Sequence, residues 1–275
     1  QLPMLKEPSQ RLHTSDPILS QAQLYPYLLE DGEKFPCFLV LPGGGYEDVV
    51  HSEGPPIAAW FNSMGISAVV LEYTVSRGDR SKSIYPQPQQ QALYAMRWLR
   101  KNAEFLNIDP RKIGVIGFSA GGHLAACVAN GFDRESWLRD PDNALSGISS
   151  RPEACILSYA VLSTTGAYAH TGSMHNLMGD SCKTSPIIKE LDWPSSVHPK
   201  APDTFVWHTV EDATVPVENA YHMALALQQK KVPHELHIFP QGAHGLGICA
   251  IDHRRQSSVV QWKQLAHRWL AEIGF

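Results

Sequence analysis

Three residues have the types and the spacing that acyl transfer requires. Ser119 stands at the centre of a G-x-S-x-G sequence, and Asp212 and then His244 follow it along the chain. A serine hydroxyl is a weak nucleophile at neutral pH, so it needs a histidine base, which in turn needs a carboxylate to orient it. The three residues are therefore predicted to form a Ser-His-Asp triad that works through an acyl-enzyme.

The surroundings of Ser119 favour a nucleophile over an ordinary turn. The apolar run Ile113–Phe118 precedes it and reads as a strand, and a helical stripe of Leu124, Cys127 and Val128 follows it. A G-x-S-x-G sequence between a strand and a helix presents the serine oxygen above the sheet, at a helix N-terminus. The alternative is a glycine-rich turn whose serine only caps the helix.

Backbone N–H groups near the serine are expected to form an oxyanion hole. One should belong to Ala120, and the second to Gly44 or Gly45 in the glycine run that follows the predicted strand Cys37–Leu41. The alternative for this run is a flexible turn. Tyr46 ends the run and is expected either to line the substrate pocket or to pack in the core.

The acid and the base each have a local rival. Asp212 and Glu211 both follow the predicted strand Thr204–Thr209, and Asp212 is preferred as the acid. His244 is preferred as the base because it follows the strand ending at Phe239, whereas no strand end delivers His253. His123, one turn after Ser119, is expected either to touch substrate or to pack in its helix.

Apolar strands alternate with helical patterns along the chain, which predicts an α/β fold with a mostly parallel sheet and helices on both faces. We expect one domain over residues 1–275, with residues 162–202 as a small cap insertion that lacks clear elements and lies over the C-terminal edge of the sheet. His170, His175 and Asn176 in this insertion either face a sugar or lie on the surface. The remaining expected strands are Ile66–Tyr73 and Ala154–Val161, and the expected helices are Gln90–Asn102, Val217–Lys230 and Gln256–Ile273.

The composition excludes several classes of protein. The chain has 275 residues, 43% hydrophobic and 18% charged, with a formal net charge of −4, which argues against disorder and gives no electrostatic footprint for nucleic acid or an anionic membrane. No apolar run approaches the roughly 18 residues of a membrane span. No signal-peptide core is present, so a cytoplasmic location is expected, although the chain begins with Gln rather than Met.

Neither a metal nor a cofactor is expected. The five cysteines are scattered and form no CxxC pair, so buried thiols are the expected state. No phosphate-binding or dinucleotide-binding glycine motif occurs. The expected partner is a small-molecule ester, and the sequence does not indicate an oligomeric state.

Taken together, four motifs resemble the α/β-hydrolase superfamily, and within it the small bacterial acetyl esterases, acetylxylan esterases and feruloyl-esterase-like enzymes. The resemblance covers about residues 35 to 273 and implies a serine carboxylic ester hydrolase that removes short acyl groups from carbohydrate or other small esters. It also draws attention to Glu53, which is expected to hold the oxyanion loop or cap a helix and is given no catalytic role. The motifs are PGGGY at Pro42–Tyr46, NIDPRKIGVIGFSAGGHLAA at Asn107–Ala126, EDATVPVENA at Glu211–Ala220 and GAHGLG at Gly242–Gly247.

Two other functions remain open at this point. One is a serine peptidase of the prolyl-oligopeptidase layout, but such enzymes usually carry a large N-terminal domain, and only about 35 residues precede the first predicted strand. The other is a catalytically silent member that only binds ligands, yet all three triad positions are filled.

Overall fold

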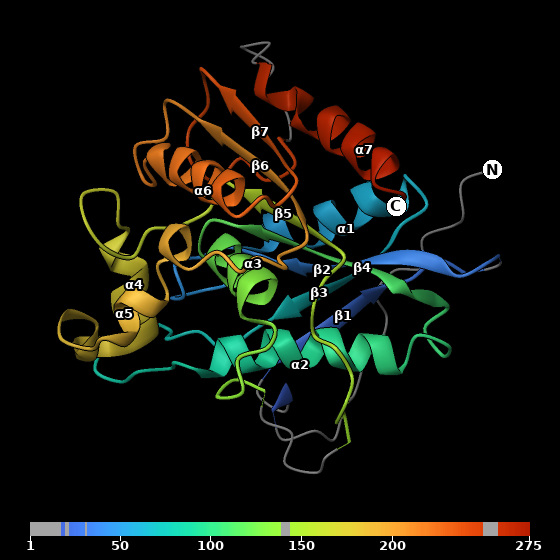
Figure 1. Cartoon of the computed structure of the whole chain (residues 1–275), viewed down its shortest axis with the longest axis horizontal. Coiled ribbons are helices and arrows are strands. Elements are labelled where there is room, and N and C mark those ends of the chain that lie inside the picture. The colour runs from blue at the N-terminus through green and yellow to red at the C-terminus, as the bar shows by residue number, and fades with distance from the viewer. Residues whose placement is uncertain (1–17, 20–21, 31, 139–143, 250–257) are drawn as a thin grey trace.

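The computed structural model describes residues 18–19, 22–30, 32–138, 144–249 and 258–275. Its centre is a seven-stranded sheet in the order β1-β3-β2-β4-β5-β6-β7, in which β1 is antiparallel to β3 and every other pair is parallel (Figure 1). The predicted mostly parallel α/β fold is therefore confirmed. The strands are β1 (Gln23–Tyr27), β2 (Phe35–Leu41), β3 (Ser67–Glu72), β4 (Ile108–Phe118), β5 (Ala154–Ser158), β6 (Asp203–Thr209) and β7 (His234–Phe239).

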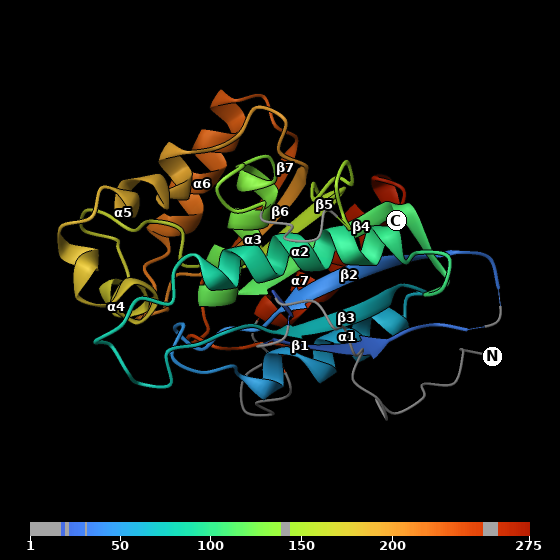
Figure 2. The same ribbon diagram turned by 90° about the horizontal axis from the view of Figure 1, so that it is seen from below.

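Helices cover both faces of the sheet, with α2, α3 and α6 on one side and α1 and α7 on the other (Figures 1 and 2). Each face has its own core, because successive strand residues point to opposite sides. In β2, for example, Phe38 and Val40 pack with α1 and α7, whereas Leu39 and Leu41 pack with α2 and α3. The helix bounds are α1 (Pro55–Asn62), α2 (Gln87–Lys101), α3 (Ala120–Gly131), α6 (Glu218–Gln229) and α7 (Trp262–Glu272).

Two elements were absent from the sequence prediction. The first strand is β1, not β2; its sequence QLYPY carries a proline and polar residues, which an edge strand tolerates because only one of its sides is paired. The helix α1 begins with Pro55 and Pro56, which read as a turn although proline is favoured in the first helical turn. The predicted helix 256–273 is confirmed from Trp262 onward, and residues 256–257 lie outside the described residues.

The segment 162–202 contains short helices, which corrects the expectation that it lacks clear elements. Several of its apolar side chains are buried, so its short apolar pieces serve as core contacts. Asn176 of α4 bonds to the loop after β2, so the segment lies over the carboxyl ends of the parallel strands. The helices are α4 (Thr171–Met178), the 3-10 helix η3 (Gly179–Lys183), α5 (Ile187–Glu190) and the 3-10 helix η4 (Trp193–Ser195).

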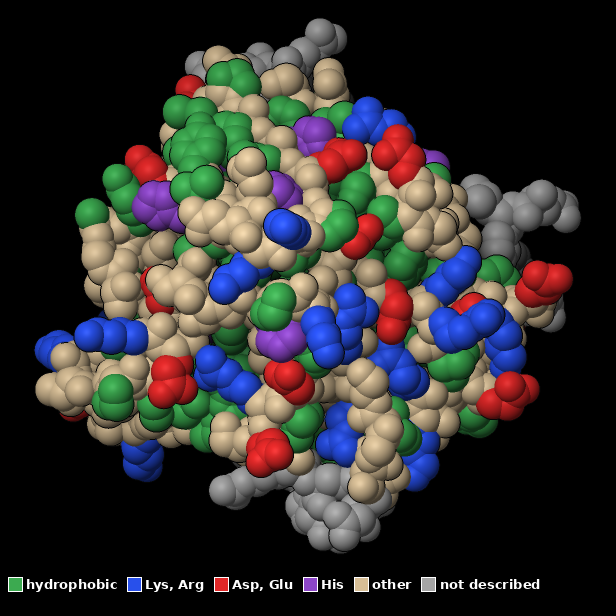
Figure 3. Space-filling view, viewed as in Figure 1, with side chains coloured by type: hydrophobic (Ala, Val, Ile, Leu, Met, Phe, Trp, Pro, Cys, Tyr) green, Lys and Arg blue, Asp and Glu red, His purple; other side chains and the backbone are tan. Residues whose placement is uncertain are grey.

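The surface carries charges of both signs. On the face drawn in Figure 3, Lys and Arg side chains are interspersed with Asp and Glu. Within the described ranges, no helix has the length and apolar character that a membrane crossing would need.

Candidate active site

Ser119 occupies a sharp turn between β4 and α3. Its φ of 53° and ψ of −120° are unusual for a residue other than glycine and hold the serine at the N-cap of α3. Gly117 and Gly121 permit this turn, because a Cβ on either residue would lie 2.1 Å from a backbone oxygen. The local sequence therefore presents the serine hydroxyl at the carboxyl edge of the sheet.

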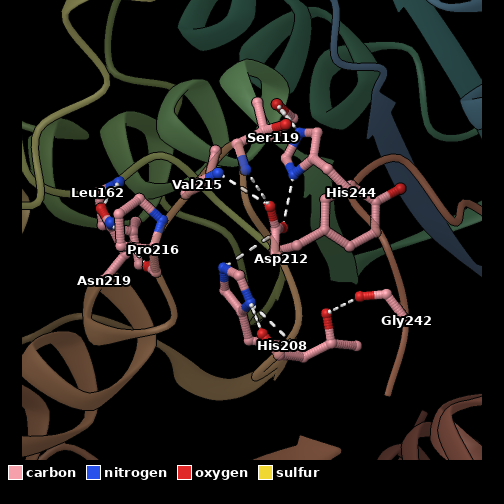
Figure 4. A network of polar contacts seen from close by, with 12 residues as sticks. Ser119, Leu162, His208, Asp212, Val215, Pro216, Asn219, Gly242 and His244 are labelled. Atoms are coloured by element: carbon pink, nitrogen blue, oxygen red, sulfur yellow. Dashed lines mark hydrogen bonds and ion pairs between the residues drawn. The ribbon is translucent and has the colours of Figure 1, made fainter. Parts of the chain in front are cut away.

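The structure brings Ser119, His244 and Asp212 together in one hydrogen-bonded row (Figure 4). Nδ1 of His244 lies 2.6 Å from Oδ2 of Asp212, and Nε2 lies 2.8 Å from Oγ of Ser119. A carboxylate can only accept, so Nδ1 carries the imidazole proton and Nε2 is left to accept from the serine hydroxyl. This is the arrangement that a serine nucleophile and its base require.

Asp212 is held as a carboxylate by several donors. Its Oδ1 accepts from the N–H groups of Thr214 and Val215, both at 2.9 Å, in addition to the His244 contact at Oδ2. Burial acts to raise the pKa of Asp212, but the hydrogen bonds from His244, Val215 and Thr214 outweigh it, and the pKa lies below its usual value. The rival acid, Glu211, is exposed and instead accepts from the N–H of Gly242 at 3.1 Å.

A second imidazole faces Asp212 from the sheet. Nε2 of His208, at the end of β6, lies 4.0 Å from Oδ2 of Asp212, so the carboxylate sits between two histidines (Figure 4). Burial lowers the pKa of His208, which favours its neutral form. Sequence reasoning missed this neighbour, because a histidine inside an apolar strand reads as a packing residue.

The glycine loop lies beside Ser119, since a Cβ on Gly43 would lie 3.0 Å from Cβ of Ser119. No described residue accepts a hydrogen bond from the N–H of Gly44, Gly45 or Ala120. The N–H of Gly43, by contrast, already donates to Oε2 of Glu53 at 2.7 Å. Gly44 has a φ of 127°, and a Cβ there would lie 2.0 Å from the Asp48 carbonyl oxygen, so only glycine fits this position.

Tyr46 and His123 do not reach the surface of the site. Both side chains are fully buried, with the Tyr46 hydroxyl 2.8 Å from Nδ1 of His123, whose Nε2 lies 3.0 Å from the Leu191 carbonyl oxygen. Burial lowers the pKa of His123 to about 4. In this structure the pair joins the glycine loop to α3, and neither residue offers a surface to a substrate.

The three polar residues of the insertion that were considered for sugar contact, His170, His175 and Asn176, lie in different surroundings. Asn176 is buried and donates from Nδ2 to the Gly45 carbonyl at 2.8 Å, so it supports the loop rather than facing solvent. His175 pairs with Asp180 at 3.3 Å, away from the triad. His170 is half-buried at the N-cap of α4, where Nδ1 accepts from the Ser173 N–H at 3.3 Å. His253 lies outside the described residues.

The described part of the chain contains no group of three or more His, Cys, Asp or Glu side chains that could hold a metal ion. All five cysteines are free thiols.

Known proteins resemble this chain over most of its length. It is 40% identical over 228 residues to the endo-1,4-beta-xylanase B of Butyrivibrio fibrisolvens, covering 82% of this chain and 34% of that protein. It is 29% identical over 212 residues to the acetylxylan esterase of Xylanibacter ruminicola, covering 76% of this chain and 40% of that protein. The chain thus spans well under half the length of either curated relative.

The crystal structure of an acetyl ester-xyloside bifunctional hydrolase from Caldicellulosiruptor lactoaceticus matches with a TM-score of 0.83 and 42% identity, over 92% of this chain and 89% of that one. Together with the sequence relatives, it confirms the predicted α/β-hydrolase fold and the predicted resemblance to acetyl and acetylxylan esterases. The BD-FAE family model matches residues 27–227, so the chain belongs to the BD-FAE family.

Proposed function

We propose that the chain hydrolyses short-chain carboxylic esters, with acetylated sugars as the preferred class, through an acyl-enzyme on Ser119. The observation that carries this proposal is the row from Ser119 Oγ through His244 to Asp212, at 2.8 Å and 2.6 Å, beside backbone N–H groups that have no acceptor among the described residues. A nucleophile, an oriented base and free oxyanion donors are the parts that acyl transfer needs.

Acylation begins when Oγ of Ser119 attacks the ester carbonyl and Nε2 of His244 takes the hydroxyl proton. The carbonyl oxygen becomes an oxyanion, which accepts hydrogen bonds from the N–H groups of Ala120 and of Gly44 or Gly45. Asp212 stabilises the imidazolium that forms. The intermediate then collapses, the bond to the alcohol oxygen breaks, and His244 returns its proton to that oxygen.

Deacylation repeats these steps with water. His244 takes a proton from water, which attacks the acyl carbon; the same N–H groups receive the oxyanion, and the bond to Oγ of Ser119 breaks. His244 gives its proton back to the serine, and the carboxylic acid leaves. One ester and one water thus become one acid and one alcohol.

The names of two relatives support the substrate class. One is named an acetylxylan esterase and another an acetyl ester-xyloside hydrolase, so each acts on an acetyl ester in a sugar context by its own name. The 40% identity to a xylanase B is consistent with the same setting.

The test compares the chain with Ser119→Ala on p-nitrophenyl acetate, on an acetylated xylo-oligosaccharide and on a peptide anilide. We expect ester cleavage by the parent chain, little or no peptide cleavage, and a mass increase of one acetyl group on the parent during turnover. Turnover should fall by a factor on the order of 10⁴–10⁶ in a Ser119→Ala protein with unchanged circular dichroism. Wild-type-like hydrolysis by that variant would exclude Ser119 as the nucleophile.

Two controls address the alternative functions. Faster cleavage of the anilide than of the ester would favour the peptidase. Failure of a fluorophosphonate probe to label the folded parent chain would favour a silent binding protein.

A further inference from the structure

Glu53 is a buried carboxylate that contacts two parts of the site at once. It is 2% exposed, in the 3-10 helix η2 (His51–Glu53) just before α1. Its Oε2 accepts from the Gly43 N–H at 2.7 Å, and its Oε1 accepts from the Tyr159 hydroxyl at 2.6 Å. The Tyr159 hydroxyl in turn accepts from the Gly247 N–H at 2.7 Å.

The two backbone N–H groups at the ends of this hydrogen-bond chain determine the direction of each hydrogen bond in it. The N–H groups of Gly43 and Gly247 can only donate, so the Tyr159 hydroxyl accepts from Gly247 and donates its own proton to Glu53. Glu53 is then an acceptor at both oxygens, a role that a carboxylate fills and a neutral amide does not. Burial raises the pKa of Tyr159 well above its ordinary value, so the phenol keeps the proton it donates.

The two ends of the row lie in the two loops that the proposed chemistry must align. Gly43 immediately precedes the expected oxyanion donor Gly44, and a Cβ on Gly43 would lie 3.0 Å from Cβ of Ser119. Gly247 lies three residues after His244 in the same loop, and a Cβ on Gly247 would lie 3.2 Å from the Ser52 carbonyl oxygen.

Tyr159 also contacts the base directly. It follows β5, is 1% exposed, and its ring centroid lies 5.1 Å from that of His244 at an interplanar angle of 72°. Its N–H donates to the Trp207 carbonyl at 2.9 Å, and its ring also packs edge-on against Trp207. The tyrosine is therefore fixed to the sheet while its hydroxyl reaches the loops above it.

We propose that Glu53 and Tyr159 are positioning residues that hold the oxyanion loop and the histidine loop at the spacing required for ester hydrolysis. This inference rests on the proposed function. Neither residue hydrogen-bonds to Ser119 or His244: Glu53 and the Tyr159 hydroxyl act through the loops they join, and the Tyr159 ring packs against His244. The oxyanion hole is used only in the transition state, so loosening it should lower kcat much more than it changes KM.

Two variants disrupt the hydrogen bonds that link Gly43 to Gly247 through Glu53 and Tyr159, with little change in side-chain shape. Glu53→Gln places an amide NH₂ against one of two donors, and Tyr159→Phe keeps the ring beside His244 but loses the hydroxyl. Tyr85→Phe is the matched control, because its hydroxyl accepts from Nε1 of Trp137 at 2.9 Å, a contact outside both loops. Removal of a whole oxyanion donor costs on the order of 10²–10³ in kcat, so a displaced donor should cost about 10–100-fold.

The experiment measures kcat and KM on p-nitrophenyl acetate for the parent, both single variants, the double variant and the control, with thermal unfolding of each. We expect each single variant to lose about 10–100-fold in kcat, with KM within about threefold. The double variant should lose no more kcat than the more impaired of the two single variants, because both substitutions break the same chain of hydrogen bonds. Tyr85→Phe should keep the parent kcat. The affinity of a trifluoromethyl ketone, whose adduct places an oxyanion in the hole, should fall by the same factor as kcat.

Three results would overturn the proposal: parent-like kcat in a folded single variant, multiplicative losses in the double variant, or a loss confined to KM. If Glu53→Gln does not fold, Tyr159→Phe and the ketone still decide the question. A failure of the proposed function is recognised separately, because active Ser119→Ala protein would reveal it whatever the two positioning variants do.

Discussion

The hydroxyl of Tyr46 donates to Nδ1 of His123 across 2.8 Å, joining the end of the glycine loop to the helix that follows the serine. Nε2 of His123 lies 3.0 Å from the Leu191 carbonyl oxygen, which can only accept, so Nε2 carries the ring proton and Nδ1 accepts. Every polar atom of the imidazole is satisfied in its neutral form. A second proton would have no acceptor at Nδ1 unless the tyrosine hydroxyl turned away.

Folding stability should therefore depend on the protonation of His123. Burial lowers its pKa from 6.5 to about 4 in the folded chain, so the unfolded chain binds a proton that the folded chain excludes. Stability from this group is fully present above about pH 6.5 and is lost as the pH falls toward 4, by roughly 3 kcal/mol at the lower end. Urea unfolding of the parent and of His123→Gln at a series of pH values measures this loss. The variant should be less stable than the parent at pH 8, and the difference between their unfolding free energies should narrow toward pH 4. A difference that does not change with pH would contradict the prediction.

The choice between the two neighbouring acids can be tested directly. Asp212→Asn should lower kcat by about 10⁴, because the amide no longer holds His244 in the tautomer that accepts the serine proton. Glu211→Gln should change kcat by less than about threefold, since its carboxylate is exposed and, among the described residues, accepts a hydrogen bond from the Gly242 N–H alone. Steady-state kinetics of the two purified variants decide the matter. A larger loss in Glu211→Gln would reassign the acid.

Asn176 should matter for both stability and rate. Its Nδ2 donates to the Gly45 carbonyl at 2.8 Å, while its Oδ1 accepts from Nε of Arg80 at 2.6 Å. Asn176→Ala leaves the partly buried Gly45 carbonyl without its donor, which should cost about 1 kcal/mol of unfolding free energy and lower kcat. The control is His175→Ala on the same helix, whose ring pairs with the exposed Asp180 and should be close to neutral. Equal effects of the two substitutions in thermal unfolding and kinetics would refute a support role for Asn176.

Short acyl groups should be the best substrates. The segment over the carboxyl edge buries several of its apolar residues in the core, and α4 comes close to the glycine loop, with Ser173 and Asn176 within 3.8 Å of a Cβ placed on Gly45. Each methylene buried in an open channel would add about 0.8 kcal/mol of binding, so a channel would give kcat/KM that rises with chain length. We expect instead a maximum at acetyl or propionyl and poor turnover from octanoyl upward. A p-nitrophenyl ester series from acetate to palmitate measures this, and a maximum at eight carbons or beyond would indicate a lipase.

Sequence alone predicted the α/β sheet, the turn at Ser119 and the row of serine, acid and histidine that the structure brings together. These features depend on short-range patterns: an apolar strand, small residues around a tight turn, and loops at strand ends that meet at one edge of a parallel sheet. The edge strand β1 escaped prediction because pairing on one side leaves little hydrophobic pattern to detect.

Only the tertiary structure decided which residues surround Ser119, His244 and Asp212. Tyr46 and His123 were open to either packing or substrate contact, and the structure buries both, with His123 held between the Tyr46 hydroxyl and the Leu191 carbonyl oxygen. Glu53 and Tyr159 are 106 positions apart in the chain, yet their oxygens lie 2.6 Å apart, and no local pattern marks two such residues as partners. The reason is physical: a buried polar group must find a donor or acceptor wherever packing places one, and that place is set by the meeting of distant segments rather than by the residues beside it.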